Sequence, residues 1–255
     1  VVTGASSGIG LELAKQLAAH HYDLVICAED GDLLDAEAGL RTAGVSVTCV
    51  QADLATDRGV DQLWHAVESL GRPVEVLVLN AGIGNGGPFV ETRLERDLRV
   101  IDLNVRSVIH LAKHVVPAMV LRGEGRVLVT SSIASTQPGT FNSVYNASKS
   151  FVQSWALALR EELSDTGVTV TSLMPGPTDT DFFARAGMED TRVGSGAKDD
   201  PADVARDGFE ALMKGEAKVV SASLKTKLMG KTGRFTPDTV KAAAHGKLAE
   251  PGSGS

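Results

Sequence analysis

The chain has 255 residues, of which 43% are apolar and 22% charged, and its formal net charge is −7. That length suits one large α/β domain or two small ones, with a core that needs neither disulfide nor metal. No dense Lys/Arg patch is visible, so we expect no nucleic-acid partner. No run approaches the ~18 apolar residues of a membrane span, and no secretory signal is recognisable, so we expect a cytoplasmic protein.

Strand-like and helix-like segments alternate along the chain. Short apolar or alternating runs indicate strands at 1–2, 22–28, 45–50, 74–79, 125–130, 168–173 and 217–220. Apolar residues at helical spacing indicate helices at 8–19, 32–43, 57–70, 91–121, 144–163 and 201–214, the fourth with a kink near Pro117. This α/β alternation predicts a parallel sheet with helices on both faces, joined by right-handed crossovers.

Three segments lack this regularity. Residues 179–200 are rich in glycine and charge and are typical of a lid or binding loop. Residues 223–250 read as a basic helical extension that would cover a cleft, mediate oligomerisation, contact an anion or simply carry solvated charge. Residues 251–255 (PGSGS) should be disordered. We therefore expect one main domain over residues 1–222, followed by a C-terminal extension over 223–255.

The cysteines and histidines give no sign of a metal site. Cys27 and Cys49 lie in apolar runs and are expected to be buried free thiols rather than a disulfide or a metal pair. The six histidines are scattered, without the spacing of zinc ligands. We therefore expect no bound metal.

A glycine-rich turn between the first strand and the first helix, Thr3 to Gly10 (TGASSGIG), is a candidate phosphate site. Glycine permits the tight turn and lets backbone N–H groups approach a pyrophosphate. Glu29 follows the second strand, where a carboxylate can bind ribose hydroxyls. A solvated charge at a helix entry explains Glu29 equally well, and Asp30 competes for the same role.

A second motif places a phenol and an ammonium on one predicted helix, as Tyr145 and Lys149 of the segment YNASK. Residues four apart lie on the same helix face, one turn from each other. A cation beside a phenol lowers the pKa of the phenol, so Tyr145 is a candidate proton donor or acceptor near neutral pH. Together with the glycine turn, the motif indicates redox chemistry at a carbonyl or alcohol carbon.

The spacing Thr-Gly-x-x-x-Gly-x-Gly, with further motifs in order, resembles the short-chain dehydrogenase/reductase family of the common single-domain type. The likeness runs from residue 1 to about residue 220. The further motifs are Asp53-Leu54, Asn80-Ala81-Gly82, Asn104 within DLNV, Ser132 thirteen residues before Tyr145, and PGPTDT at 175–180. The resemblance implies a Rossmann-like, doubly wound, mostly seven-stranded parallel sheet in three α/β/α layers.

The resemblance also implies an NAD(P)-dependent oxidoreductase that interconverts a secondary alcohol and a ketone or aldehyde by hydride transfer. Tyr145 would be the general acid/base, Lys149 would lower its pKa and hold the nicotinamide ribose, Ser132 would orient the substrate oxygen, and Asn104 would anchor a water linked to Lys149. The implied cofactor contacts are Gly4, Ser6, Ser7, Gly8, Ile9, Gly10, Glu29, Asp53, Leu54, Asn80, Ala81, Gly82, Tyr145, Lys149, Pro175, Gly176, Thr178 and Thr180. Purely structural roles stay open for Asn80, Asn104 and Asp53, as backbone ties and a helix cap.

The residues around the glycine turn bear on the choice of cofactor. Family members that bind a 2′-phosphate usually carry Arg or Lys in the turn or just after the second strand. Here those positions hold Ser6, Ser7, Ala28 and Glu29, and a carboxylate repels a 2′-phosphate. We expect NAD(H) in preference to NADP(H). NADP(H) stays open, because the acid stands one place after the family's usual Asp, which aligns with Ala28.

We expect a small-molecule substrate bound by segments 84–90, 133–142 and 179–189. Phe141, Phe182, Phe183 and Met188 indicate an apolar substrate body, although hinge packing accounts for them as well. The resemblance implies that helices 91–121 and 144–163 pair across a two-fold axis in a homodimer or homotetramer, whereas core packing explains the same apolar residues without a partner. The alternative function is a non-catalytic nucleotide-sensing protein, although such relatives typically lose the Tyr or the Lys.

Overall fold

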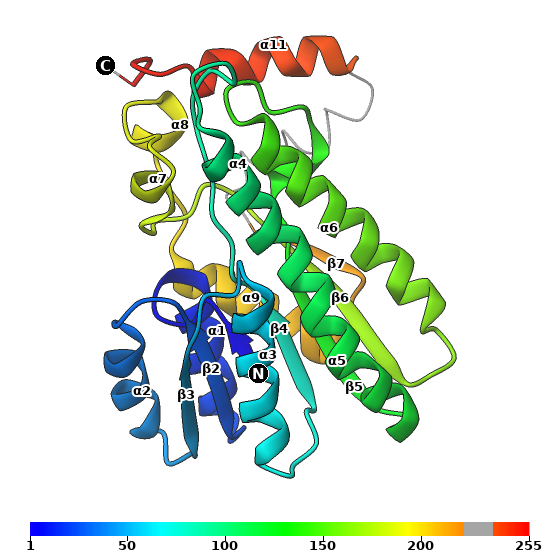
Figure 1. The fold of residues 1–255 in the computed structure, drawn as a ribbon. Helices are drawn as coiled ribbons and strands as arrows, with labels where there is room; N and C mark the ends of the chain where they lie inside the picture. The colour runs from blue at the N-terminus through cyan, green and yellow to red at the C-terminus, as the bar shows by residue number, and fades with distance from the viewer. Residues whose placement is uncertain (222–236, 255) are drawn as a thin grey trace.

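The computed structural model of the chain describes residues 1–221 and 237–254, in which seven strands form one parallel sheet (Figure 1). In chain order the strands are β1 (Val2–Thr3), β2 (Leu24–Ala28), β3 (Val47–Gln51), β4 (Val76–Leu79), β5 (Gly125–Thr130), β6 (Val168–Pro175) and β7 (Lys218–Ser221). Their order across the sheet is β3-β2-β1-β4-β5-β6-β7. The direction of progression therefore reverses between β1 and β4, the point at which ligands bind in open parallel sheets.

Helices cover both faces of the sheet, which confirms the predicted doubly wound fold. They are α1 (Gly8–Ala19), α2 (Leu33–Arg41), α3 (Asp57–Ser69), α4 (Leu94–Ile101), α5 (Ser107–Arg122), α6 (Ser143–Glu162), α7 (Phe182–Arg185), α8 (Arg192–Ser195), α9 (Pro201–Lys214) and α11 (Asp238–Ala249). Leu13 of α1 and Val204 of α9 belong to one apolar core, and Leu63 of α3 and Leu111 of α5 belong to the other. Two cores on opposite faces make three layers.

Strand β4 shows why the central strands read as continuous apolar runs. Val76 and Val78 lie in the core with α1 and α9, whereas Leu77 and Leu79 lie in the core with α3 and α5. Successive side chains of a strand point to opposite faces, so a strand covered on both sides needs apolar residues at every position.

Helix α9 has the limits predicted from the sequence, and local chemistry explains both ends. Pro201 occupies the first turn, where no backbone N–H is needed, and the Asp200 side chain accepts a hydrogen bond of 2.8 Å from the Ala202 N–H. At the other end Gly215 adopts a left-handed conformation with φ of +65°, which glycine reaches without a steric penalty.

The helical run predicted for 91–121 starts later and is interrupted. Helix α4 begins at Leu94, and a π-helical turn, Asp102–Arg106, separates it from α5. The sequence predicts a kink near Pro117, but α5 continues through that residue. The helical run departs from α-helical geometry at the π turn instead. That turn carries Asn104, whose inward side chain binds the loop after β4. π-Helical turns are frequent at functional sites.

The end of the chain differs from the expected disorder. Residues 251–254 form turns in which the Gly252 N–H donates to Asp190 Oδ2 and the Gly254 N–H to the Asp190 carbonyl, both at 2.8 Å. These hydrogen bonds hold the tail against the segment that leads into α8. Helix α11 agrees with the expected helical extension. The basic residues that the sequence places at 225, 227, 231 and 234, and the domain boundary at 222, lie outside the described residues.

Two further expectations concern the cysteines and membrane spans. Both cysteines are free thiols, Cys27 buried as expected and Cys49 partly exposed. Among the helices of the described residues, none combines the length and apolar character that crossing a bilayer requires.

Candidate active site

The turn between β1 and α1 depends on glycine at three positions. Gly4 and Gly8 have φ of +65° and +53°, in the left-handed region that favours glycine. A Cβ at Gly10 would overlap the carbonyl oxygen of Gly4. The backbone of the turn is therefore bare and close-packed, as the approach of a phosphate group requires.

Asn80, at the end of β4, ties the strands that meet at the switch point. Its Nδ2 donates to the carbonyl oxygens of Thr3 (3.1 Å) and Gly4 (3.3 Å), and its Oδ1 accepts from Thr130 Oγ1 at 3.0 Å. The side chain thus bonds to β1, the glycine turn and β5. This geometry supports the structural role that the sequence left open for Asn80.

A cavity of about 500 Å³ opens at this edge of the sheet. Nineteen of the twenty sequence-predicted site residues line it: Gly4, Ser6, Ser7, Gly8, Ile9, Gly10, Glu29, Asp53, Leu54, Asn80, Ala81, Gly82, Ser132, Tyr145, Lys149, Pro175, Gly176, Thr178 and Thr180. The exception is Asn104. The parallel topology brings these residues together because the carboxyl ends of all the strands meet at one edge.

The expected substrate-lining segments are confirmed in part. Residues of 133–142 and 179–189 line the cavity, whereas none of 84–90 does. That segment instead packs closely against α7 and the residues after it. A Cβ at Gly84 would lie 2.7 Å from Phe182 Cζ, one at Gly86 would overlap Met188, and the Gly86 N–H donates to the Ala186 carbonyl at 2.9 Å. Phe182 and Met188 themselves reach the cavity.

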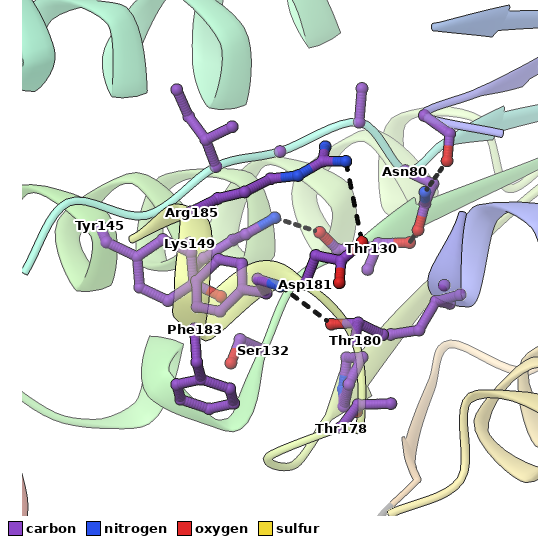
Figure 2. Close-up of a pocket in the computed structure, with 18 of the residues that line it drawn as sticks. Asn80, Thr130, Ser132, Tyr145, Lys149, Thr178, Thr180, Asp181, Phe183 and Arg185 are labelled. Carbon is purple, nitrogen blue, oxygen red and sulfur yellow. Dashed lines mark hydrogen bonds and ion pairs between the residues drawn. The ribbon is translucent and has the colours of Figure 1, made fainter. Parts of the chain in front are cut away.

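Tyr145 lines the cavity and is partly exposed there (Figure 2). Its ring lies 5.1 Å from the ring of Phe182. Burial raises the pKa of Tyr145 to about 12, and a hydrogen bond with Ser132 acts in the lowering direction. The expectation of a lowered pKa is therefore wrong for this structure. The loss of phenolate hydration raises the pKa by more than the neighbouring groups lower it. Ser132 Oγ also accepts from the Ala134 N–H at 3.1 Å, which orients that hydroxyl.

Lys149 lies beside Tyr145, as the four-residue spacing predicted. Its Nζ is 5.9 Å from the centre of the Tyr145 ring and donates to the Thr130 carbonyl at 2.8 Å (Figure 2). Burial lowers the pKa of Lys149 from 10.5 to about 8. The amine is thus held between the end of β5 and the phenol, and it is still mostly protonated at neutral pH.

Asn104 makes the structural contacts that the sequence left open. Its Nδ2 donates to the Ile83 carbonyl, its Oδ1 accepts from the Ile83 N–H, both at 2.9 Å, and Nδ2 also reaches Ser148 Oγ at 3.0 Å. A Cβ at Gly82 would lie 3.1 Å from Lys149 Nζ and 3.2 Å from Asn104 Oδ1. The absence of a side chain at Gly82 therefore leaves these two polar groups facing a shared space.

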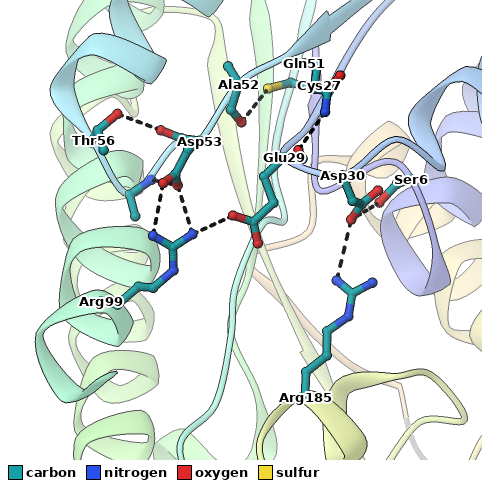
Figure 3. A network of polar contacts seen from close by, with 11 residues as sticks. Ser6, Cys27, Glu29, Asp30, Gln51, Ala52, Asp53, Thr56, Arg99 and Arg185 are labelled. Atoms are coloured by element: carbon teal, nitrogen blue, oxygen red, sulfur yellow. Dashed lines mark hydrogen bonds and ion pairs between the residues drawn. The ribbon is translucent and has the colours of Figure 1, made fainter. Parts of the chain in front are cut away.

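An ion-pair network borders the cavity beyond β2 and β3 (Figure 3). Arg99 of α4 donates to Glu29 Oε2 at 2.5 Å and to the two carboxylate oxygens of Asp53 at 3.0 and 3.2 Å. Burial alone would raise the pKa of Asp53, but the hydrogen bonds from Arg99 and the Ala55 N–H outweigh it and lower the pKa. Asp53 Oδ1 accepts that Ala55 N–H at 3.0 Å, which closes a local turn. The cap of α3 is Thr56, whose side chain accepts from the Gly59 N–H, so Asp53 does not cap that helix.

Asp30 is the second carboxylate at this border. One oxygen, Oδ2, accepts from Ser6 Oγ at 3.1 Å and lies 3.7 Å from Arg185 Nη1 (Figure 3). The other, Oδ1, is buried without a hydrogen-bond partner among the described residues. A buried carboxylate oxygen of this kind calls for a donor such as a ribose hydroxyl. The sequence offered Asp30 only as a competitor of Glu29. Of the two, Asp30 is thus the better placed to accept a hydrogen bond from a ribose hydroxyl.

Helix α11 adds two cavity-lining residues that the sequence did not single out, His245 and Leu248. His245 Nδ1 lies 3.0 Å from the Thr140 carbonyl, and Thr140 Oγ1 donates to the Ala242 carbonyl at 2.7 Å. Burial lowers the pKa of His245, and the bond to Thr140 acts in the opposite direction. A neutral ring that donates from Nδ1 keeps Nε2 as a hydrogen-bond acceptor.

Comparison with known proteins agrees with this geometry. A family model described as short chain dehydrogenase matches residues 1–190. Ketoacyl reductase HetN of Nostoc sp. is 29% identical over 251 residues, covering 94% of this chain and 85% of that protein. Retinol dehydrogenase 8 of Bos taurus is 35% identical over 190 residues, which span 71% of this chain but only 59% of that protein.

The structural comparison covers almost the whole chain. A short-chain dehydrogenase from Sphingobium yanoikuyae, solved in complex with NADPH, superposes with a TM-score of 0.82 at 29% identity over 91% of both chains. The match to the family model, the parallel seven-stranded sheet and the motifs gathered at one cavity lead to one conclusion: the chain belongs to the short-chain dehydrogenase/reductase family of oxidoreductases.

Proposed function

We propose that the protein is an NAD(P)-dependent oxidoreductase that interconverts a secondary alcohol and a ketone or aldehyde by hydride transfer. The observation that carries the proposal is the meeting of Ser132, Tyr145 and Lys149 in the cavity at the switch point of the sheet. A hydroxyl, a phenol and an amine in that arrangement supply the hydrogen bond and the proton that a carbonyl oxygen needs.

The residues of the cavity fit a dinucleotide. The turn at Gly4, Gly8 and Gly10 leaves backbone where a side chain would otherwise stand, and the unpaired Oδ1 of Asp30 offers an acceptor to a ribose. We propose the eighteen cofactor contacts implied by the sequence, all of which line the cavity, as the binding surface, with Lys149 on the sugar next to the nicotinamide. When bound, the nicotinamide supplies or accepts the hydride.

The chain's own residues manage the proton. Ser132 donates a hydrogen bond to the substrate oxygen and stabilises the charge that develops there. Tyr145 gives its proton to that oxygen in reduction, and takes it back in oxidation. The ammonium of Lys149 stabilises the phenolate that remains. The ammonium then passes a proton to that phenolate, and a water anchored by Asn104, which shares a space with Lys149 beside Gly82, links the amine to solvent and restores its proton.

The proposal is tested by a turnover screen of ketones and secondary alcohols with NADH, NADPH and their oxidised forms, followed by absorbance of the reduced nicotinamide. We expect saturable turnover of at least one carbonyl compound. Cofactor binding without turnover across a broad panel would instead favour a nucleotide-sensing protein.

The charge of the network at Glu29 predicts a preference for NAD(H). The three carboxylates Glu29, Asp30 and Asp53 outnumber the two guanidiniums of Arg99 and Arg185. Two like charges 4 Å apart repel by about 1 kcal/mol in bulk water and about 4 kcal/mol at an effective dielectric constant of 20. We expect Glu29→Gln to improve the NADPH-to-NADH ratio of kcat/KM by about fivefold or more.

The control for this prediction is Glu95→Gln, which removes the same charge from an exposed position on α4 outside the cavity lining. It should leave the cofactor ratio unchanged. An unchanged ratio in Glu29→Gln, or wild-type preference for NADPH, would contradict the assignment of these carboxylates.

The cavity wall next to the proposed reaction centre predicts a substrate with an apolar body. Phe182, Phe183, Met188 and Leu248 line this part of the cavity. The relatives named above act, by their names, on ketoacyl groups and on retinol, both of which carry extended apolar chains. We propose a ketone or alcohol of this shape as the substrate class.

His245 is expected to hold a polar group of that substrate through Nε2, the ring nitrogen that does not bond to Thr140. We expect His245→Ala to raise KM for the substrate by about three- to tenfold, the worth of one hydrogen bond, with little change in kcat or in cofactor affinity. The measurement is steady-state kinetics with the best substrate of the screen.

His245→Asn separates recognition from a structural role. Its amide N–H can still reach the Thr140 carbonyl, but it has no group at the place of Nε2. We expect it to behave like His245→Ala. Recovery of wild-type KM in His245→Asn would show that only the tie to Thr140 matters.

We also propose that the chain forms a homodimer or homotetramer. Leu98 and Ile101 of α4 and Phe151 of α6 are 43–47% exposed, although they are large and apolar. These helices contact each other in the chain and are the ones whose pairing the family resemblance implies. Burial of such side chains against a second copy would remove them from water.

A further inference from the structure

A second cluster of ionisable side chains lies outside the cavity, between α3 and α5. Asp57 and Asp61 stand one turn apart on α3, and His110 and His114 stand one turn apart on α5. Residues four apart share a helix face, so each helix presents a pair of potential ligands to the other. None of the four lines the cavity.

The atoms of three of these residues are already spaced like metal ligands. Asp61 Oδ1 lies 3.4 Å from His110 Nε2 and 3.7 Å from His114 Nε2, and the ligand atoms of the three residues all lie within 4.8 Å of one another. Bonds of 2.0–2.1 Å in a tetrahedral site place neighbouring ligand atoms about 3.3 Å apart. The two Asp61 distances are thus already close to that value.

We propose that Asp61, His110 and His114 bind one divalent transition-metal ion, with Zn²⁺ as the best fit, and that the ion ties α3 to α5. Two imidazole nitrogens and one carboxylate oxygen favour zinc, nickel or copper, whereas magnesium and calcium prefer all-oxygen sites. The partial exposure of Asp61 leaves the fourth position to water.

The unpartnered ring nitrogen of His114 is a second observation that supports a metal ion at this place. Its Nε2 is buried and has no hydrogen-bond partner among the described residues, since Asp61 Oδ1 at 3.7 Å is beyond hydrogen-bond reach. The ring stacks on Trp64 of α3 with centres 5.2 Å apart and planes at 14°, which holds it in place. A fixed imidazole nitrogen aimed at two other ligand atoms gains most from a cation between them.

The surroundings of His110 match the outer shell of a metal site. Its other ring nitrogen, Nδ1, lies 3.6 Å from Asp57 Oδ1, and Arg106 pairs with the same aspartate. At 3.6 Å this is an ion-pair distance and not yet a hydrogen bond. On a slightly closer approach the carboxylate would fix the ring and raise the basicity of the metal-bound nitrogen. Asp57 is therefore a positioning residue, not a ligand.

Two protonated imidazoles paired with the aspartates would be the competing explanation. That arrangement needs protons rather than metal, and it would place two cationic rings 5.1 Å apart. Like charges at that separation repel each other, whereas a shared cation requires both rings to be neutral. Metal titration near pH 7.5 separates the two.

The test uses the untagged chain, because a histidine tag would compete for metal. Zn²⁺ binding is measured by titration calorimetry, and Co²⁺ binding by the visible absorption of a tetrahedral complex. We expect one ion per chain and a melting temperature that rises with free Zn²⁺. Asp61→Asn and His114→Ala should each weaken binding by more than about tenfold, and Asp57→Asn by about tenfold.

His65→Ala is the matched control, since this histidine lies on the same helix, α3, and its Nδ1 hydrogen-bonds with the backbone carbonyl of Asp61 rather than with a side chain of the proposed site. It should keep wild-type affinity. Asp61→Asn is nearly isosteric, so circular dichroism can verify its fold if His114→Ala fails to fold. Absence of saturable one-to-one binding, or affinity unchanged in folded Asp61→Asn, would overturn the proposal.

Discussion

Replacement of Tyr145 by phenylalanine is expected to lower kcat by about 10²–10⁴-fold, the range that a positioned general acid or base contributes. The substitution removes one oxygen and keeps the ring that packs against Phe182. The glycine turn, Asp30 and Lys149 are untouched, so the cofactor dissociation constant should stay close to that of the wild type. Turnover is followed by absorbance of the reduced nicotinamide, and cofactor binding by titration calorimetry.

Tyr22→Phe is the matched control, because the sequence contains only two tyrosines. The Tyr22 hydroxyl lies near Met213 Sδ, at 3.9 Å, and does not line the cavity. This variant should turn over substrate at the wild-type rate. Full activity of Tyr145→Phe would contradict the proposed mechanism. A protein that senses nucleotides without catalysis would bind cofactor equally well in all three forms and turn over substrate in none.

Much of the cavity could be predicted because it is built from motifs at strand ends. The glycine turn after β1, Asp53 after β3, Asn80 after β4 and Ser132 after β5 are far apart in sequence but meet at one edge of the sheet. Once strand–helix alternation indicates a parallel sheet, this convergence follows from the topology alone.

Residues contributed by helix packing were out of reach. Arg99 is 70 residues from Glu29 in the chain, and nothing in its own helix marks it as a partner of two carboxylates. His245 reaches the cavity only because α11 folds back over Thr140. Such contacts depend on how helices sit on the sheet, which local periodicity does not encode.

The pKa of Tyr145 is another property that the sequence alone does not predict. The four-residue spacing to Lys149 predicts a neighbouring charge, but the pKa depends on burial as well, and burial dominates. The histidines of the proposed metal site are similar. His110 and His114 alone are two candidate ligands, too few to predict a metal site, which is why the sequence alone indicates none. The proposed third ligand, Asp61, becomes visible only when α3 packs on α5.

Replacement of Lys149 by methionine is expected to abolish most turnover, to a degree similar to Tyr145→Phe. The variant keeps the length and apolar stem of the side chain but removes the charge that stabilises the phenolate of Tyr145. It also removes the proposed contact with the cofactor sugar, so the cofactor dissociation constant should rise, unlike that of Tyr145→Phe. Kinetics and calorimetry on the two variants separate these effects.

The same variant should change how stability depends on pH. The pKa of Lys149 falls from 10.5 to about 8 on folding, so between these values the unfolded chain binds a proton that the folded chain has lost. Stability of the wild type therefore rises with pH across this window, by about 3 kcal/mol in total. Below pH 8 the full cost of burying the ammonium is present.

Urea unfolding at pH 7 and pH 10 measures this contribution. Between the two pH values, the free energy of unfolding of the wild type should increase by about 2–3 kcal/mol more than that of Lys149→Met. Lys214→Met, at an exposed position on α9, should show no such change. A pH-independent difference between the wild type and Lys149→Met would mean that Lys149 keeps an ordinary pKa. Burying the protonated amine of Lys149 therefore lowers the stability of the folded chain at neutral pH. A residue that costs stability in this way is not explained by folding alone, so a buried, still protonated amine beside a phenol points to catalysis.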